Sequence, residues 1–282
     1  MPQTILDILN RAAQANSTDT FRLGNLIHLP LRGSLVAAGD IHGHRRNFER
    51  IVAFADLTNN PDRHVILQEI IHGGPQDCAG GCLSYKLLFD AARYKLAFPN
   101  RVHIIMGNHD TAFISSSEVM KDGKEMNRAL SLALEQEFHE ACADIKLAIK
   151  QFLFSQPLAA KCENRIWISH SLPGDRLFAK FDPDIMNRPL TAADCEKPGS
   201  AYLLTWGRNH SQALLDKLAG LFGVDTFILG HQSQQQGWSR AANNLLIIAS
   251  DHDHGCLLPI DLTSPSAADR LVSSLVPLAA IA

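Results

Sequence analysis

The sequence predicts an α/β sandwich with mixed β-sheets, on three observations. Short apolar or β-branched runs alternate with helical patterns early in the chain, which is typical of crossover units and a partly parallel sheet. The late strand candidates follow one another closely, as the strands of a hairpin would. The 282 residues are 46% hydrophobic and 20% charged, which allows a packed core and argues against disorder.

The expected elements follow from apolar composition and periodicity. Seven short runs have the composition of strands: 35–38, 65–71, 102–106, 166–169, 226–229, 245–249 and 256–260. Helical periodicity covers 45–55, 82–98, 124–154 and 212–222, and the first 16 residues are expected to form a short amphipathic helix.

We expect one domain, 1–282, with a helical insertion or flank at about 117–154. Apolar residues recur at helical spacing through much of that segment and predict one or two packed helices. The segment 183–200 contains three prolines and little periodicity, so it is expected to be a loop, one of those in which substrate specificity would lie.

Composition narrows the range of partners and compartments. The net charge is −3 without a polybasic arm, so a nucleic-acid partner has no electrostatic support. No apolar run approaches the roughly 18 residues that span a bilayer, so no membrane partner is expected. The N-terminus lacks the basic region of a signal peptide, and the six scattered cysteines favour reduced thiols in a cytoplasm. The sequence does not define an oligomeric state.

Residues that bind metals follow four of the expected strands. Asp40 and His42 follow the first, Asn108 and His109 a second, and a histidine, His170 or His231, follows each of two others. Ligands collect at the carboxyl ends of strands in α/β sheets, and carboxylate with neutral imidazole suits a transition-metal dication. Each residue alone has a plainer interpretation as turn chemistry, so the prediction depends on the ordered set.

The ordered motifs GDIHG, GNHD, a strand-end His before Pro-Gly and a late GH resemble those of the calcineurin-like metallophosphoesterases. The resemblance is closest to the phosphoprotein-phosphatase branch, which includes the diadenosine tetraphosphate hydrolases. It covers residues 40–231 and implies a four-layer α/β/β/α sandwich of mixed sheets. It also implies two divalent metal ions, Mn²⁺ first, with Fe or Zn as alternatives.

Carried over position by position, the resemblance gives a role to each strand-end residue. Asp40 and His42 would bind the first metal ion. The second would be bound by Asn108, His170 and His231. His109 would act as the general acid. Asp110 is retained as a further catalytic candidate, although a residue adjacent to His109 is expected to point away from the substrate.

The second family motif, G-D-x-x-D-R-G, departs from the pattern in this chain. Glu69 takes the place of the bridging Asp, so a carboxylate is kept but is one methylene longer. His72 replaces the Asp that orients the catalytic His, and Gly73 replaces an Arg that binds phosphate. His72 could instead contact His109 or approach a metal itself.

Three further residues have open alternatives. Arg208 follows a Trp in a stretch like the family's W-x-R and would supply a guanidinium for phosphate oxygens; the alternative is a surface Arg in a loop. Asp251 and His252 belong to SDHDHG between two late strands. They are expected either to form a polar hairpin turn or to add a metal or substrate contact.

The resemblance implies a metallophosphatase that hydrolyses phosphate monoesters, as protein phosphatases do, with a hydroxide held by two metal ions. A phosphorylated protein or small molecule is the expected partner. A diadenosine polyphosphate hydrolase is one alternative. Another is a degenerate phosphatase fold that serves only as a binding or regulatory protein. Serine hydrolase, P-loop and Rossmann motifs are absent from the sequence.

Overall fold

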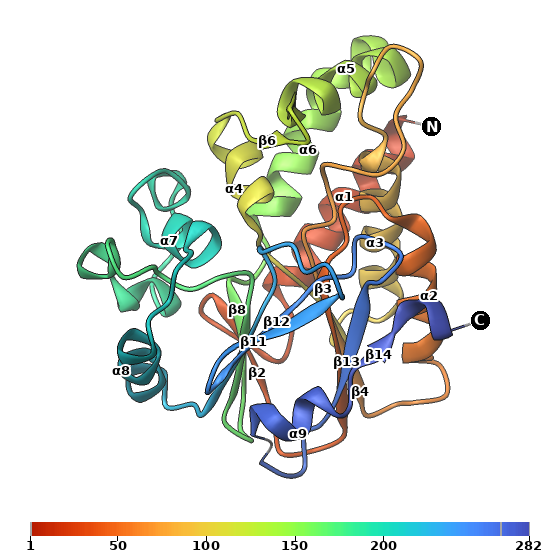
Figure 1. Cartoon of the computed structure of the whole chain (residues 1–282). Coiled ribbons are helices and arrows are strands. Elements are labelled where there is room, and N and C mark those ends of the chain that lie inside the picture. The colour runs from red at the N-terminus through yellow and green to blue at the C-terminus, as the bar shows by residue number, and fades with distance from the viewer. Residues whose placement is uncertain (1, 266, 282) are drawn as a thin grey trace.

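The computed structural model describes residues 2–265 and 267–281. Two β-sheets pack face to face and helices cover their outer faces (Figure 1), so the expected α/β/β/α sandwich of mixed sheets is confirmed. The seven-stranded sheet runs in the order β1 (Arg22–Leu23), β2 (Leu26–Leu29), β8 (Ala159–Cys162), β9 (Ile166–Ser169), β10 (Thr226–Leu229), β12 (Leu245–Ile248) and β11 (Trp238–Ala242).

The five-stranded sheet runs in the order β14 (Val276–Pro277), β13 (Cys256–Asp261), β3 (Ser34–Asp40), β4 (Arg63–Gln68) and β5 (Val102–Ile105). Strands β3, β4 and β5 are parallel, as are β9, β10 and β12, so their carboxyl ends lie together within each sheet. A separate hairpin joins β6 (Met120–Lys121) to β7 (Lys124–Glu125).

The longer helices cover the two outer faces and the upper edge of the sandwich in Figure 1, whereas the short α9 (Ala268–Val272) lies at the lower edge. The longer helices are α1 (Pro2–Ser17), α2 (Arg45–Ala55), α3 (Ser84–Ala97), α4 (Asn108–Ser115), α5 (Met126–Phe138), α6 (Cys142–Phe154), α7 (Ser200–Trp206) and α8 (Gln212–Phe222). Short 3₁₀ turns lie at His139–Ala141, Phe178–Lys180, Pro183–Met186, Ala192–Cys195 and Leu278–Ala280. Within the described residues, no helix combines the length and the hydropathy that a membrane span requires.

Strand alternation divides the core between two layers. Leu35 and Ala37 of β3 belong to the cluster between the sheets, whereas Val36 and Ala38 belong to the larger cluster beneath the helices. This is the period of two that a strand buried on both faces requires.

Several boundaries differ from the sequence prediction. The expected strand 65–71 ends at Gln68, because Glu69 takes a left-handed conformation with φ of 50°. The helical segment 124–154 is divided into α5 and α6 at His139, whose φ is 46°. The short strands β1, β2, β8 and β11 were not expected.

The expected late hairpin is wrong. Strands β12 and β13 belong to different sheets: β12 pairs with β10 and β11, and β13 pairs with β3 and β14. Both strands are almost wholly apolar and buried, so each pairs inside its own sheet. The segment 249–255 therefore crosses between the sheets and passes beside Asp40, whose backbone bridges to Ala249.

Candidate active site

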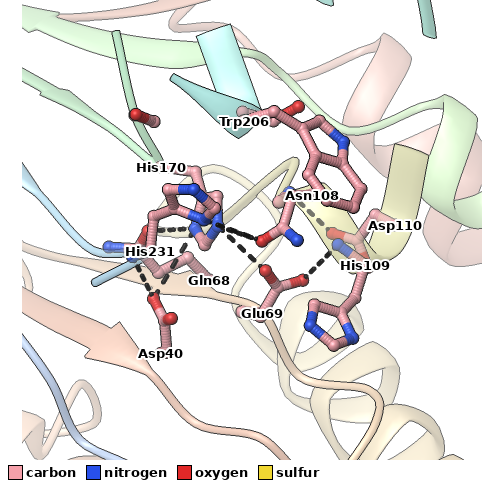
Figure 2. A network of polar contacts seen from close by, with 12 residues as sticks. Asp40, Gln68, Glu69, Asn108, His109, Asp110, His170, Trp206 and His231 are labelled. Atoms are coloured by element: carbon pink, nitrogen blue, oxygen red, sulfur yellow. Dashed lines mark hydrogen bonds and ion pairs between the residues drawn. The ribbon is translucent and has the colours of Figure 1, made fainter. Parts of the chain in front are cut away.

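The site lies at the carboxyl ends of five strands from both sheets (Figure 2). Asp40 ends β3, and Glu69 directly follows β4. Asn108 begins α4 two residues after Met106, and His170 directly follows β9. His231 follows β10 after a single glycine. Sequence-distant residues thus meet because parallel strands end at a common edge.

Glu69 lies at the centre of the site. Its Oε1 accepts a hydrogen bond from the backbone N–H of His109 at 3.1 Å, and its Oε2 lies 2.9 Å from Nε2 of His170. A Cβ on Gly107 would approach Oε1 to 2.5 Å, so only glycine there leaves room for this carboxylate. The absent side chain at Gly107 accommodates the carboxylate of the longer Glu69.

Three further donor atoms converge around the amide of Asn108. Its Oδ1 lies 2.8 Å from Nε2 of His170 and 3.0 Å from Nδ1 of His231. The other nitrogen of His170, Nδ1, lies 3.0 Å from Oε1 of Gln68, whose Nε2 in turn donates to the carbonyl of Ala38. Gln68 therefore fixes the orientation of the His170 ring and leaves its Nε2 facing the site.

Asp40 and His42 form the other side of the cluster. Oδ1 of Asp40 accepts from the backbone N–H of His231 at 2.9 Å, and its Oδ2 lies 3.8 Å from Nε2 of His42. Nδ1 of His42 donates to the carbonyl of Ile71 at 3.1 Å, which leaves the lone pair of Nε2 directed at the cluster. A Cβ on Gly230 would come within 2.2 Å of Asp40, so this approach also requires glycine.

Four of these residues have a left-handed backbone that is uncommon outside glycine. They are His42, Glu69, His72 and His231, with φ between 44° and 66°. Such conformations are unfavourable locally and persist where the surrounding fold imposes them, often at functional sites. The backbone geometry thus coincides with the predicted motifs.

The donor atoms suit metal ions. Two groups each offer ligand atoms within 4.8 Å of one another: His42, Glu69 and His109, and Asp40, Glu69 and His170. Glu69 belongs to both groups, as a carboxylate shared by two ions would. Buried acceptors without a hydrogen-bond partner include Glu69 Oε2 and His231 Nε2. The fold therefore leaves acceptors that a dication would satisfy.

The electrostatics agree with this fit. Burial raises the pKa of Glu69 to about 8 and that of Asp40 to about 6. Burial lowers the pKa of His42 to about 4 and that of His231 well below its ordinary value, so both imidazoles are neutral. Neutral imidazole is the form that binds metal ions. The raised pKa values of the two carboxyl groups mean that their buried negative charge is unfavourable without a cation, and a bound dication would lower both values.

His109 lies next to His72, with 2.9 Å between their Nδ1 atoms. One Nδ1 donates and the other accepts, so His72 makes the contact that the family's orienting carboxylate would have made. Burial lowers the pKa of His109 well below its ordinary value and that of His72 to about 3. Asp110 points away from this pair: its Oδ2 accepts from the N–H of Gly107 and caps α4.

A pocket of about 440 Å³ opens above the cluster and is lined by Asp40, His42, Asn108, His109 and His231. Further lining residues include Lys121, Arg208 and Asp251. Arg208 is exposed and extends past the carbonyl of His231, with Nη2 at 3.5 Å. His252 does not line the pocket, because its ring nitrogens contact the carbonyl of Gln234 and the N–H of His254.

Lys121 and Gln68 are not among the residues predicted from sequence. Lys121 lies on β6, and its Nζ is 3.3 Å from Oδ2 of Asp251 across the pocket. Asp122 and Gly123 both have positive φ, as a two-residue type I′ hairpin requires. The Asp-Gly pair between two short lysine-containing runs indicates a hairpin in the sequence. The position of that hairpin over the pocket depends on the tertiary structure.

Comparisons with known proteins identify the family and the fold. Residues 33–235 match the family model described as calcineurin-like phosphoesterase. A protein serine/threonine phosphatase from Saccharomyces cerevisiae with similarity to human phosphatase PP5 has a similar fold, with a TM-score of 0.67 at 13% identity, over 99% of this chain and 93% of that one. No curated protein matches the chain by sequence.

A second solved structure with this fold is a cold-active protein-tyrosine phosphatase of a psychrophilic Shewanella sp. It has a TM-score of 0.58 at 15% identity, over 84% of this chain and 77% of that one. At these identities the two structures establish the shared fold.

Proposed function

Because the chain belongs to the calcineurin-like phosphoesterase family, it is a hydrolase of phosphoester bonds, and we propose that it hydrolyses phosphate monoesters at two divalent metal ions. The observation that carries the proposal is the position of Glu69 in both groups of ligand atoms. A single carboxylate common to two donor sets is the arrangement by which a protein holds two ions a few ångströms apart.

Following the family motifs, the proposed ligands are Asp40 and His42 for one ion, Asn108, His170 and His231 for the other, and Glu69 for both. The two groups of ligand atoms agree with this assignment in sharing Glu69, but they pair Asp40 with His170 and His42 with His109. Imidazole, carboxylate and amide oxygen together suit Mn²⁺, with Fe or Zn as alternatives. When bound, the ions would polarise the phosphoryl oxygens and lower the pKa of water. The hydrogen bonds from His42 to Ile71 and between His170 and Gln68 fix these rings before any ion arrives.

His109 is the proposed proton donor to the leaving oxygen. If Nδ1–H of His72 donates to Nδ1 of His109, His109 holds its own proton on Nε2, the nitrogen away from that contact. This tautomer allows a neutral imidazole to protonate a leaving alkoxide. Asp110 contributes by capping α4, the helix that begins at Asn108 and carries His109.

Arg208 and Lys121 are the proposed phosphate-binding cations. Both line the pocket, and neither is paired with a carboxylate buried inside the cluster. A guanidinium and an ammonium on opposite elements would stabilise the charge on the phosphoryl oxygens. Lys121 thereby supplies the positive charge that the family's motif places where this chain has Gly73.

The substrate proposed is a phosphorylated protein or small molecule, and the compartment proposed is the cytoplasm. The compartment rests on the expectation of reduced thiols for six scattered cysteines.

The test is hydrolysis of p-nitrophenyl phosphate by metal-stripped protein after addition of Mn²⁺, with metal counting and an Asp40→Asn control. We expect turnover to appear at about two ions per chain and to disappear in the control. One ion or none, without turnover, overturns the proposal and leaves the degenerate binding protein as the function. Two ions without turnover on this probe would shift the test to phosphopeptides and nucleotides.

A further inference from the structure

A second cavity, of about 450 Å³, adjoins the active-site pocket. We call it the Tyr202 cavity; its lining includes Arg176, Lys197, Tyr202, Trp206 and Arg208. Trp206 and Arg208 line both cavities, so the two adjoin at these side chains. The volume lies within the range of about 300–1,000 Å³ that holds small molecules.

The Tyr202 cavity contains an aromatic pair. Tyr202 and Trp206 are four residues apart on α7, and their rings stack at 5.3 Å with an interplanar angle of 12°. Trp206 is fixed by a hydrogen bond from Nε1–H to Oγ1 of Thr111 at 2.9 Å. Both rings are partly exposed, so they present a fixed planar surface suited to stacking against a flat ring.

The cations of this cavity are uncompensated. Arg176 and Lys197 are exposed, and within the described chain neither forms a hydrogen bond or ion pair. Asp175, the acidic residue of the lining, is already engaged by the N–H and the hydroxyl of Ser211. Arg176, Lys197 and Arg208 outnumber Asp175 in the lining, so the cavity keeps a net positive charge that suits an anionic ligand.

We propose that the Tyr202 cavity binds the leaving group of the substrate, and that this leaving group is a nucleotide. The base would stack on the Tyr202–Trp206 pair, and additional phosphates would lie between Arg176 and Lys197, while the scissile phosphate occupies the pocket above Glu69. An aromatic surface beside several cations, within a cavity of about 450 Å³, fits a nucleotide better than an extended phosphopeptide. The inference rests on the proposed phosphoesterase function and extends it from a phosphate monoester to the terminal phosphoanhydride bond of a nucleotide, where water releases phosphate and the shortened nucleotide leaves.

Three probes separate the contribution of the ligand's ring from that of its additional phosphates. ADP has both, p-nitrophenyl phosphate has a ring without further phosphates, and tripolyphosphate has the charges without a ring. We expect the KM for ADP to be lowest in the wild-type, Mn²⁺-loaded protein. A tyrosine-phosphorylated peptide is the fourth probe, and equilibrium binding of AMP to metal-free protein gives a readout that needs no turnover.

Variants test the aromatic pair and the cations of the cavity separately. Tyr202→Leu should raise the KM for ADP about tenfold, whereas Tyr202→Phe, which keeps the ring, should restore it. Arg176→Ala with Lys197→Ala should raise the KM for ADP and tripolyphosphate about fivefold relative to that for p-nitrophenyl phosphate. Lys180→Ala is the matched control, an exposed cation on the same loop that does not line the cavity, and it should change no KM.

The outcomes distinguish this inference from the proposed function. Hydrolysis of p-nitrophenyl phosphate without a cavity-dependent response to ADP overturns the nucleotide site and leaves the phosphoesterase intact. AMP binding that is lost in Tyr202→Leu, without hydrolysis of any probe, supports the nucleotide cavity and overturns the activity. A response of the phosphopeptide alone to these variants overturns the nucleotide assignment.

Discussion

Strands β4 and β5 bury titratable side chains at both of their ends, and the two clusters differ in charge balance. At the amino ends, Asp19 accepts a hydrogen bond from Lys95 at 2.7 Å and lies 3.0 Å from Nδ1 of His103. His103 stacks on His64, with 3.1 Å between Nε2 and Nδ1. Burial raises the pKa of Asp19, but His103 and Lys95 outweigh it and lower that pKa well below its ordinary value.

At the carboxyl ends, none of the described residues places a buried cation beside the carboxylates. Burial raises the pKa of Glu69 to about 8 and that of Asp110 well above its ordinary value. The ammonium group that lines this pocket, Lys121, is about a quarter exposed and pairs with Asp251 at the rim. The titratable groups at one end of these two strands thus form a self-neutralised cluster, and those at the other end form an uncompensated one. Burial of titratable groups alone does not mark a site; the missing counter-charge does.

The largest expected effect comes from removing the central charge of the uncompensated cluster. Glu69→Gln keeps the side-chain shape and an oxygen for the N–H of His109 but removes the carboxylate common to both ligand groups. We expect turnover to fall about 10³-fold and the bound metal to fall below two ions per chain. Steady-state kinetics and metal counting measure this. Two retained ions with turnover within tenfold of wild type would show that Glu69 is not shared between them.

The corresponding change at the other end should act on stability instead. Asp19→Asn leaves Lys95 buried without its anion, so the free energy of unfolding should fall by about 3 kcal/mol in urea titrations, with kcat little changed. Asp225→Asn, which breaks the exposed pair with Arg165, is the control and should have little effect. A large loss of metal binding in Asp19→Asn would contradict the separation of the two clusters.

The site could be predicted from sequence where it depends on strand ends. Asp40 ends a strand, and Asn108 and His231 follow one within three residues, so apolar runs and motif order were sufficient to bring them together. The longer Glu69 could be anticipated as a carboxylate, but the space that Gly107 leaves for it is visible only in three dimensions. The contact between His72 and His109 was one of two alternatives that the sequence could not separate, the other being an approach of His72 to a metal ion.

Features that depend on tertiary pairing could not be predicted. Short strands such as β8 are only four residues long, and their pairing with distant partners is not encoded in a local pattern. The segment between β12 and β13 is as short as the loop of a hairpin. Only the pairing partners of each strand show that it crosses between the sheets instead. The cluster of Asp19, Lys95 and His103 is spread over more than 80 positions, without a motif to connect it.

The charge balance at the amino ends also predicts a pH dependence. Burial lowers the pKa of His64 to about 4, below the value near 6.5 of an unfolded chain, so the folded state binds fewer protons between those values. Stability is therefore fully present above pH 6.5 and is lost as the pH falls toward 4, by about 2 kcal/mol. His64→Gln should remove this part of the dependence in urea titrations at pH 7.5 and 4.5. The exposed His254→Gln should leave the dependence as in wild type.

The smallest expected effect, on kcat/KM, comes from replacing Lys121, which differs from Lys95 in its exposure. Lys95 is buried in its ion pair with Asp19, whereas Lys121 is accessible to a substrate phosphate. Lys121→Met should therefore lower kcat/KM for p-nitrophenyl phosphate about tenfold, as loss of a charge-assisted contact does. Lys124→Met, on the paired strand of the same hairpin and outside the pocket lining, is the control and should not.

Asp251 separates phosphate binding from a purely structural role for Lys121. If Lys121 binds phosphate, its ion pair with Asp251 competes with the substrate, so Asp251→Asn should lower KM. If Lys121 serves only to hold the hairpin over the pocket, Asp251→Asn breaks the same ion pair. It should then reproduce the loss of kcat/KM expected for Lys121→Met. The two roles predict changes of opposite sign, so measuring KM in the two single variants decides whether Lys121 acts on the substrate. The buried charges at the amino ends of the strands are not accessible to a substrate.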